Sequence, residues 1–240
     1  MIGSIRGNFY LAESKPKPMR RFLGNVHWGD KLIDILVVVL GITIAFGLNN
    51  WRENRQNAKL EQRYLKNLKE DLVKDTLQMV NIKRDLRGTS FAVACIKRIS
   101  PEIENADSVA IYLDDVFSLN YFIFFPEDYT YETLQQSGDI SIIQSDSIRQ
   151  VLSQLYDNYE FMRLLYEYAL NTLSDEISPY VDNLSARTSQ VEDPTMYQST
   201  HFDNLVNEYG RQLAGVEFLV ESSLEKHRIL QHLITKELNK

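Results

Sequence analysis

The strongest constraint on this chain is the apolar run from Leu32 to Trp51, LIDILVVVLGITIAFGLNNW. Twenty helical residues reach about 30 Å, the thickness of a bilayer's hydrocarbon core. Asp34 interrupts one end of the run, and Asn49 and Asn50 interrupt the other. The run predicts a transmembrane anchor, with Asp34 near the water. The residues assigned to this anchor are Ile35, Leu36, Val37, Val38, Val39, Leu40, Gly41, Ile42, Ala45, Phe46, Leu48 and Trp51.

Two other interpretations of the run are open. A cleaved signal peptide would explain the small-x-small triplet at Ala45 to Gly47, but signal peptides seldom begin their apolar region beyond residue 30. A buried core helix would suit the short strictly apolar part, but Trp51 is typical of an interface and basic residues flank both ends. Gly41 and Ala45 would let two spans approach closely, although small residues are also ordinary in spans.

Charge is unevenly distributed after the apolar run. Residues 52–98 carry 12 basic and 6 acidic residues, whereas residues 99–240 carry 8 basic and 24 acidic residues. A basic stem could lie close to anionic head groups, or it could complement the chain's own acidic part. The acidic distal part argues against nucleic acid as a partner. Cys95 is the single cysteine, which excludes an internal disulfide and a zinc site built from thiolates.

Three further segments repeat apolar residues at spacings of three and four, which is typical of amphipathic helices. The first stripe is Leu65, Leu68, Leu72, Asp75, Met79, Ile82 and Leu86. The second stripe is Ile148, Leu152, Leu155, Tyr159, Met162, Tyr166, Ala169 and Leu173. The third stripe is Phe202, Val206, Tyr209, Leu213, Val216, Val220, Ser223, His227, Leu230 and Ile234. We therefore expect an all-α fold, in which the transmembrane helix continues into a long stem helix and an antiparallel helical bundle.

Besides Ser223 and the tyrosines, two stripe positions are polar, His227 and Asp75. His227 fits a partly buried, hydrogen-bonded histidine better than a metal ligand. Asp75 could meet a basic group if the helices pair, although such a seam usually opens locally to water. The stretch Tyr121 to Tyr131 is the most aromatic in the chain and contains Pro126, so it cannot be a regular helix throughout. We expect it to form a loop lid against the bundle, and a docking surface is the alternative.

The segment Tyr131 to Tyr156, YETLQQSGDISIIQSDSIRQVLSQLY, resembles a family of uncharacterised bacterial single-span membrane proteins. The span ending Asn49-Asn50-Trp51-Arg52-Glu53 is similar to the stretch with which that family leaves the membrane. The resemblance implies a Gram-negative inner-membrane location and a helical soluble part, in a family known only as a domain of unknown function. The motif positions are Tyr131, Leu134, Ser137, Gly138, Ile143 and Asp146.

The same motif has a direct physical interpretation. Gly138 can take the left-handed conformation that ends a helix, and Ser145 or Asp146 can accept backbone N–H groups at the start of the next one. We therefore predict a helix-turn-helix corner, whose connector packs Ile140, Ile142 and Ile143 into the core. A ligand or partner site at this corner is the alternative.

The chain contains no phosphate-binding glycine loop, no GxSxG and no HExxH, and Glu225-Lys226-His227 lacks di-iron spacing. We expect no enzyme activity, no catalytic residues, no cofactor and no metal. The expected divisions are a basic tail over 1–31, a transmembrane helix over 32–51, a stem helix over 52–99, and a helical bundle domain over 100–240 that packs on the stem.

For function, we expect a membrane-anchored protein-interaction or assembly module whose partners are the lipid bilayer and another protein or a second copy. An extracytoplasmic sensory or ligand-binding bundle, acting through a partner chain, is the alternative. A pocket with converging polar groups would favour the alternative, and a closed core with an exposed apolar face would favour assembly. Basic residues flank the span on both sides and do not decide its topology, but the short basic tail favours residues 52–240 outside the cytoplasm, with the span in the inner membrane.

Overall fold

The computed structural model describes residues 28–118, 124–183 and 191–240, and it divides the chain into two units, Met1–Glu53 and Asn54–Lys240. Helix α1 runs from Trp28 to Ile99 and contributes to both units. Within the described residues there is no strand, and nearly all of the chain outside short connections is helical. The predicted all-α fold, with a long apolar helix near the amino end and a helical bundle, is confirmed.

In the first unit, the part of α1 that carries the apolar run has no buried side chain from Leu32 to Trp51. Its one polar side chain in the apolar centre, Thr43, donates a hydrogen bond to the carbonyl of Val39 at 2.8 Å, which satisfies the hydroxyl within the helix. Among the described residues, this is the single helix long and apolar enough to cross a membrane. Because no side chain of the run is buried, the core-helix interpretation is not supported, and the helix continues unbroken past Ala45 to Gly47.

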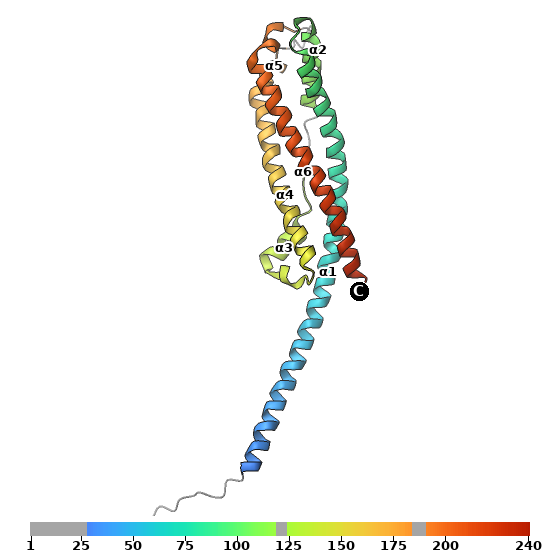
Figure 1. The fold of residues 1–240 in the computed structure, drawn as a ribbon, viewed down its shortest axis with the longest axis vertical. Helices are drawn as coiled ribbons and strands as arrows, with labels where there is room; N and C mark the ends of the chain where they lie inside the picture. The colour runs from blue at the N-terminus through green and yellow to red at the C-terminus, as the bar shows by residue number, and fades with distance from the viewer. Residues whose placement is uncertain (1–27, 119–123, 184–190) are drawn as a thin grey trace, which may run out of the picture. The chain divides into compact units, whose positions relative to one another are not determined.

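The second unit is built on three long helices: the remainder of α1, α4 (Asp146–Asn171) and α6 (Thr200–Leu238). Figure 1 shows these three side by side in the bundle. Every residue of the three predicted stripes is buried except Tyr166, which is half-buried. The spacing of apolar residues therefore identified the inner faces of all three helices.

Chain direction in the bundle follows from contacts at several levels. Helix α6 runs antiparallel to α1, since Lys83 pairs with Glu221 and Ser100 bonds to Asp203 farther along. It is also antiparallel to α4. By contrast, α1 and α4 run parallel to each other, because Glu61 contacts Gln144 just before α4 and Asp75 contacts Tyr159 farther along both helices.

The shorter elements lie at the two ends of the bundle (Figure 1). They are η1 (Ile103–Asn105), α2 (Ala106–Ser118), α3 (Tyr129–Ser137), η2 (Asp139–Ile142), the π-helical η3 (Thr172–Ile177), α5 (Ser178–Val181) and η4 (Pro194–Gln198). Helix α2 packs with α5 and η4, whereas α3 packs with η2 at the other end. These elements close both ends of a core that contains α2's Val109, Leu113 and Val116.

Opposite charges join the basic stem to the acidic part of the bundle. Lys83 lies 2.7 Å from Glu221 of α6, and Lys74 lies 3.4 Å from Glu127. Arg87 approaches Glu217 of α6 at 3.9 Å. Ion pairs at a solvated surface contribute little to stability, because water screens them. The expectation that the stem complements the chain's own acidic part is met at these pairs.

Candidate functional site

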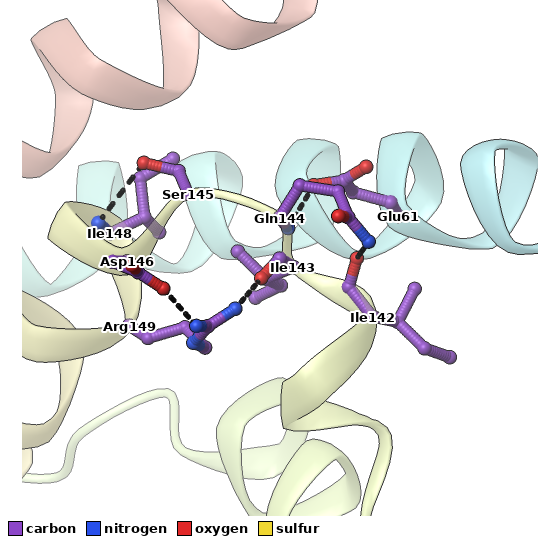
Figure 2. Close-up of polar contacts among 8 residues, drawn as sticks. All are labelled: Glu61, Ile142, Ile143, Gln144, Ser145, Asp146, Ile148 and Arg149. Carbon is purple, nitrogen blue, oxygen red and sulfur yellow. Dashed lines mark hydrogen bonds and ion pairs between the residues drawn. The ribbon is translucent and has the colours of Figure 1, made fainter.

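The predicted corner forms between α3 and α4. Gly138 has φ of 76° and ends α3 in the left-handed conformation, and the Ser145 hydroxyl accepts the N–H of Ile148 at the start of α4. Figure 2 shows this capping bond together with the contact of Gln144 to Glu61 of α1, where the Gln144 N–H donates to the carboxylate at 2.6 Å. Ile143 is fully buried in the connector, whereas Ile140 and Ile142 are half-buried.

The other motif positions are also accounted for by local packing. Leu134 is fully buried, while Ser137 and Asp146 are exposed. Asp146 pairs with Arg149, whose guanidinium also donates to the Ile143 carbonyl (Figure 2). Tyr131 differs from the rest because its ring stacks on Tyr156 at a centroid distance of 3.8 Å, away from the turn. Turn chemistry therefore explains the corner, and Tyr131 belongs to a different site.

That site is at the middle of the bundle, where polar side chains from all three long helices meet. The Tyr159 hydroxyl lies 3.0 Å from Asp75 Oδ2 and also bonds to His227 Nε2. On the other side of the imidazole, His227 Nδ1 lies 2.8 Å from Thr76 Oγ1, which donates to the Leu72 carbonyl at 2.6 Å. Asp75 and His227 are each only 1 % exposed. Asp75 and His227 are thus connected through one tyrosine.

Burial is the largest cause of the pKa shifts of Asp75, Tyr159 and His227. It raises the pKa of Asp75 from its ordinary 3.8 to about 6, and it lowers the pKa of His227 from its ordinary 6.5 to about 4. The pKa of Tyr159 is raised as well, first by burial and then by the Asp75 charge. Each shift disfavours the charged form, because a buried charge loses the solvation that water provides. Of the two possibilities raised for Asp75, a basic group is not among its hydrogen-bond partners, which are a tyrosine and a backbone amide, and a seam open to water does not fit its burial.

The described end of the aromatic stretch, Phe124 to Asp128, is attached to this centre. Asp75 Oδ1 accepts the Glu127 N–H at 2.9 Å, and the Gln78 side-chain amide donates to the Phe125 carbonyl at 2.9 Å. Phe124 is half-buried and meets the Tyr159 ring edge-on at 4.9 Å. We call Phe124 to Asp128 the strap.

The strap carries features of both predicted alternatives for the aromatic stretch. Its backbone is bonded to α1, as expected of a lid, but Phe125 is 68 % exposed and the following Tyr129 is 80 % exposed. Residues 121–123 of the stretch lie outside the described part of the chain.

A pocket of about 450 Å³ opens beside the strap. Aromatic, other apolar and charged side chains line it. The aromatic lining residues are Phe124, Phe125, Tyr131, Tyr156, Tyr159 and Tyr166, and the other apolar ones are Ile82, Pro126, Met162 and Val216. The charged lining residues are Asp128, Glu132, Glu160 and Arg163. Tyr159 therefore lines the pocket and also bonds through its hydroxyl to the buried Asp75 and His227.

A second hollow, of about 750 Å³, lies between α1 and α6 near Val93 and Gly210. It is a broad, open groove whose polar lining residues include Lys97, His201 and Arg211. None of these three side chains is buried. The aromatic pocket is the stronger candidate, because buried titratable groups with shifted pKa values beside an apolar pocket are typical of functional sites.

Sequence reasoning located two of the three central groups but missed the third. Asp75 and His227 were visible as polar interruptions of apolar stripes, whereas a tyrosine in a stripe is indistinguishable from ordinary core. Thr76 was missed because it lies one position away from the stripe. Within the described residues, no cluster of three or more His, Cys, Asp or Glu side chains could hold a metal ion.

The described chain is thus an all-α protein that combines a helix able to cross a membrane with a helical bundle containing an aromatic pocket. It belongs to a family of unknown function (DUF6090), whose model matches residues 34–207. That range includes the span ending and the central motif on which the expected family resemblance was based. No curated protein and no solved structure matches the chain.

Proposed function

We propose that this protein is a membrane-anchored ligand-binding module whose pocket takes a small organic cation with an apolar body. The observation that carries the proposal is the aromatic pocket of about 450 Å³ beside the strap. Ligand pockets usually measure about 300 to 1,000 Å³ and combine apolar walls with a few polar groups. By the criterion set from the sequence, such a pocket favours the sensory or ligand-binding alternative over assembly.

The walls suit a cation. The stacked rings of Tyr131 and Tyr156, and the edge-to-face pairs of Tyr159 with Phe124 and Tyr156, fix several aromatic rings around one space. The face of an aromatic ring carries a negative partial charge, which attracts an ammonium group by about 0.5 to 2 kcal/mol per contact. The same rings also remove the apolar part of a ligand from water.

The charged residues that line the pocket also favour a cation. They are three carboxylates, Asp128, Glu132 and Glu160, and one guanidinium, that of Arg163. Arg163 pairs with Glu160 at 2.9 Å, so Asp128 and Glu132 give the lining a net negative charge. This charge disfavours anions and attracts cations.

In this proposal the apolar part of α1 is a single-pass anchor in the cytoplasmic membrane of a bacterium, and the bundle lies on the extracytoplasmic side. The role is binding without catalysis, and a partner chain receives the signal. The supporting observations are the exposed apolar run and the basic amino tail.

Isothermal titration calorimetry on the full-length protein in nanodiscs of zwitterionic lipid tests this function. Benzyltrimethylammonium and phenylacetate carry similar aromatic bodies with opposite charges, and empty nanodiscs correct for partition into lipid. We expect the cation to bind at least tenfold more tightly than the anion. Binding of neither probe would overturn the proposed function, and equal binding of both would overturn the ligand class.

Two phenylalanine variants provide a matched control. Phe125 is 68 % exposed and lines the pocket, whereas Phe161 is 56 % exposed on α4 and lies outside it. Phe125→Ala should weaken benzyltrimethylammonium binding, and Phe161→Ala should leave it unchanged. Because both side chains are largely exposed, neither change should affect folding greatly.

Assembly is the second candidate, with a second copy of this chain as the partner. Phe161, Leu164 and Tyr168 form an exposed apolar stripe along α4, 56 %, 47 % and 58 % exposed. Confinement to one membrane would raise the effective concentration of copies and favour their pairing. Leu164→Cys should give disulfide-linked dimers in oxidised membranes, whereas Arg228→Cys on α6 should not; equal cross-linking of the two variants argues against the stripe.

A further inference from the structure

We infer that a proton controls how firmly the strap is held. When the linked groups Asp75, Tyr159 and His227 take up one proton, the hydrogen bond that the Glu127 N–H donates to Asp75, which we call the latch, becomes weaker. The inference rests on the proposed function in treating the strap as one wall of a ligand site. The bond itself is a property of the bundle without any ligand.

The directions of the hydrogen bonds follow from a single fixed point. The Leu72 carbonyl can only accept, so the Thr76 hydroxyl at 2.6 Å must donate to it. The Thr76 oxygen then accepts from His227, which places a hydrogen on Nδ1. In a neutral imidazole Nε2 is therefore an acceptor, and the Tyr159 hydroxyl must donate to it.

This arrangement leaves one hydrogen missing. Tyr159 has a single hydroxyl hydrogen but lies between two acceptors, His227 Nε2 and the ionised carboxylate of Asp75. Four contacts, from Asp75 through Tyr159, His227 and Thr76 to the Leu72 carbonyl, have three hydrogens among them when Asp75 is ionised and His227 is neutral. One additional proton completes all four contacts.

The additional proton has two possible positions. On Asp75 Oδ2, it is donated to the Tyr159 oxygen while Tyr159 donates to Nε2. In the other form, that proton has passed to the Tyr159 oxygen and the former Tyr159 proton has passed to Nε2, giving a carboxylate and an imidazolium. No atom or charge is gained or lost in this transfer. The opposite pKa shifts of Asp75 and His227 favour the first form, with the proton on the carboxyl.

The acidic groups around Asp75 also raise its pKa and so favour the proton on its carboxyl. Asp71 of α1 and Glu127 of the strap both raise its pKa by repulsion, after burial. The bond from the Glu127 N–H lowers it, and so does Tyr159 whenever its hydroxyl donates to Asp75 instead of His227. Lys74 of α1 faces Glu127 and partly offsets that charge. On α4, Tyr156 has a pKa raised mainly by burial, so it stays neutral, and burial is the dominant influence on His227 of α6.

Protonation has opposite effects on the two oxygens of Asp75. It completes the contact of Oδ2 with Tyr159, and it removes the negative charge that strengthens the bond from the Glu127 N–H to Oδ1. Hydrogen bonds to a charged acceptor are roughly twice as strong as neutral ones. The strap is therefore held most firmly when Asp75 is ionised.

Hydrogen–deuterium exchange of the full-length protein, read by mass spectrometry on peptides covering residues 124–128, tests the latch without ligand. After correction for intrinsic rates, strap exchange should be about fivefold faster at pH 5 than at pH 7.5, as expected for loss of charge assistance. In Asp75→Asn, the amide oxygen accepts from Glu127 and the amide nitrogen donates to Tyr159. This variant should show the faster exchange at both pH values.

Two further variants make the test specific. Asp85→Asn makes the same substitution at a half-buried site on α1 and should keep the wild-type pH dependence. His227→Gln retains the carboxyl and should also keep it. The latch is overturned if strap exchange in the wild type is the same at both pH values, or if Asp75→Asn retains the wild-type pH response. Because no probe is bound, failure of benzyltrimethylammonium to bind would reject the proposed function and leave this result unaffected.

Discussion

The corner between α3 and α4 and the polar centre of the bundle satisfy their hydrogen bonds in different ways. At the corner most partners are close in sequence, as with Ser145 and the Ile148 N–H. At the centre, Tyr159 is separated by 84 residues from Asp75 and by 68 from His227. The hydrogen bonds of the corner need no additional proton, whereas the four contacts of the centre need one more proton before each has a hydrogen. Local turn chemistry thus fixes the path of the chain at the corner, whereas the long-range polar contacts at the centre make it sensitive to pH.

The largest effect should follow removal of the central hydroxyl. Tyr159→Phe leaves Asp75 Oδ2 and His227 Nε2 buried without their shared partner, and we expect it to destabilise the bundle by about 3 kcal/mol. Chemical denaturation followed by circular dichroism on the full-length protein measures this. Tyr168→Phe, at a site 58 % exposed on the same helix, should change stability by less than about 0.5 kcal/mol. If both variants lost the same small amount of stability, the Tyr159 hydroxyl would contribute no more than an exposed one, and the prediction would be wrong.

Asp75→Asn should stabilise the bundle at pH 7.5, by about 2 kcal/mol, because it removes a desolvated charge. It also leaves His227 as the main titrating group of the centre. The folded-state pKa of His227, about 4, lies below its ordinary 6.5, so the unfolded state takes up a proton first. Stability of this variant should therefore fall as the pH decreases from 6.5 to 4. Unfolding midpoints at a series of pH values test the slope, and a variant that gains stability on acidification contradicts it.

His227→Gln should give the opposite slope. It leaves Asp75, whose folded-state pKa of about 6 lies above its ordinary 3.8, so the folded state takes up a proton first. The stabilisation is fully present below pH 3.8 and is lost as the pH rises through 6, a change of about 3 kcal/mol. In the wild type the two slopes largely cancel over this range. The same denaturation series should therefore show a nearly flat wild type between two variants of opposite sign, and slopes of the same sign would refute the coupling.

The smallest effect is expected at the corner. Gly138→Ala places a side chain at φ of 76°, where an alanine is strained, and should cost about 1 kcal/mol. Gly88→Ala, at an exposed position inside α1, should instead stabilise the helix by up to about 1 kcal/mol. Neither change should alter the pH dependence of unfolding. A pH-dependent effect of Gly138→Ala would show that the two regions are not independent.

The same contrast explains what the sequence could predict. The stripes that contain Leu65, Leu152 and Val206 follow from a period of 3.6 residues, which any single helix reveals. Gly138 and Ser145 follow from local backbone chemistry. The partner of Asp75 could not be predicted, because it depends on how three helices align along their axes, and no local pattern sets that alignment. The pocket could not be predicted either, because its lining residues come mainly from the strap, α3 and α4, which are brought together only in the folded bundle.

The parallel direction of α1 and α4 has a consequence for biosynthesis. The inner face of α1 packs against α4 and α6, and both of these helices follow α1 in the chain. A ribosome therefore delivers the stem long before it delivers the helix that covers it. Helices α4 and α6 are antiparallel and are separated by fewer residues than α1 is from either of them, so α4 and α6 should associate first and receive α1 afterwards. Until then the leucines of the stem remain uncovered, and a chaperone that recognises apolar helices would find its target there.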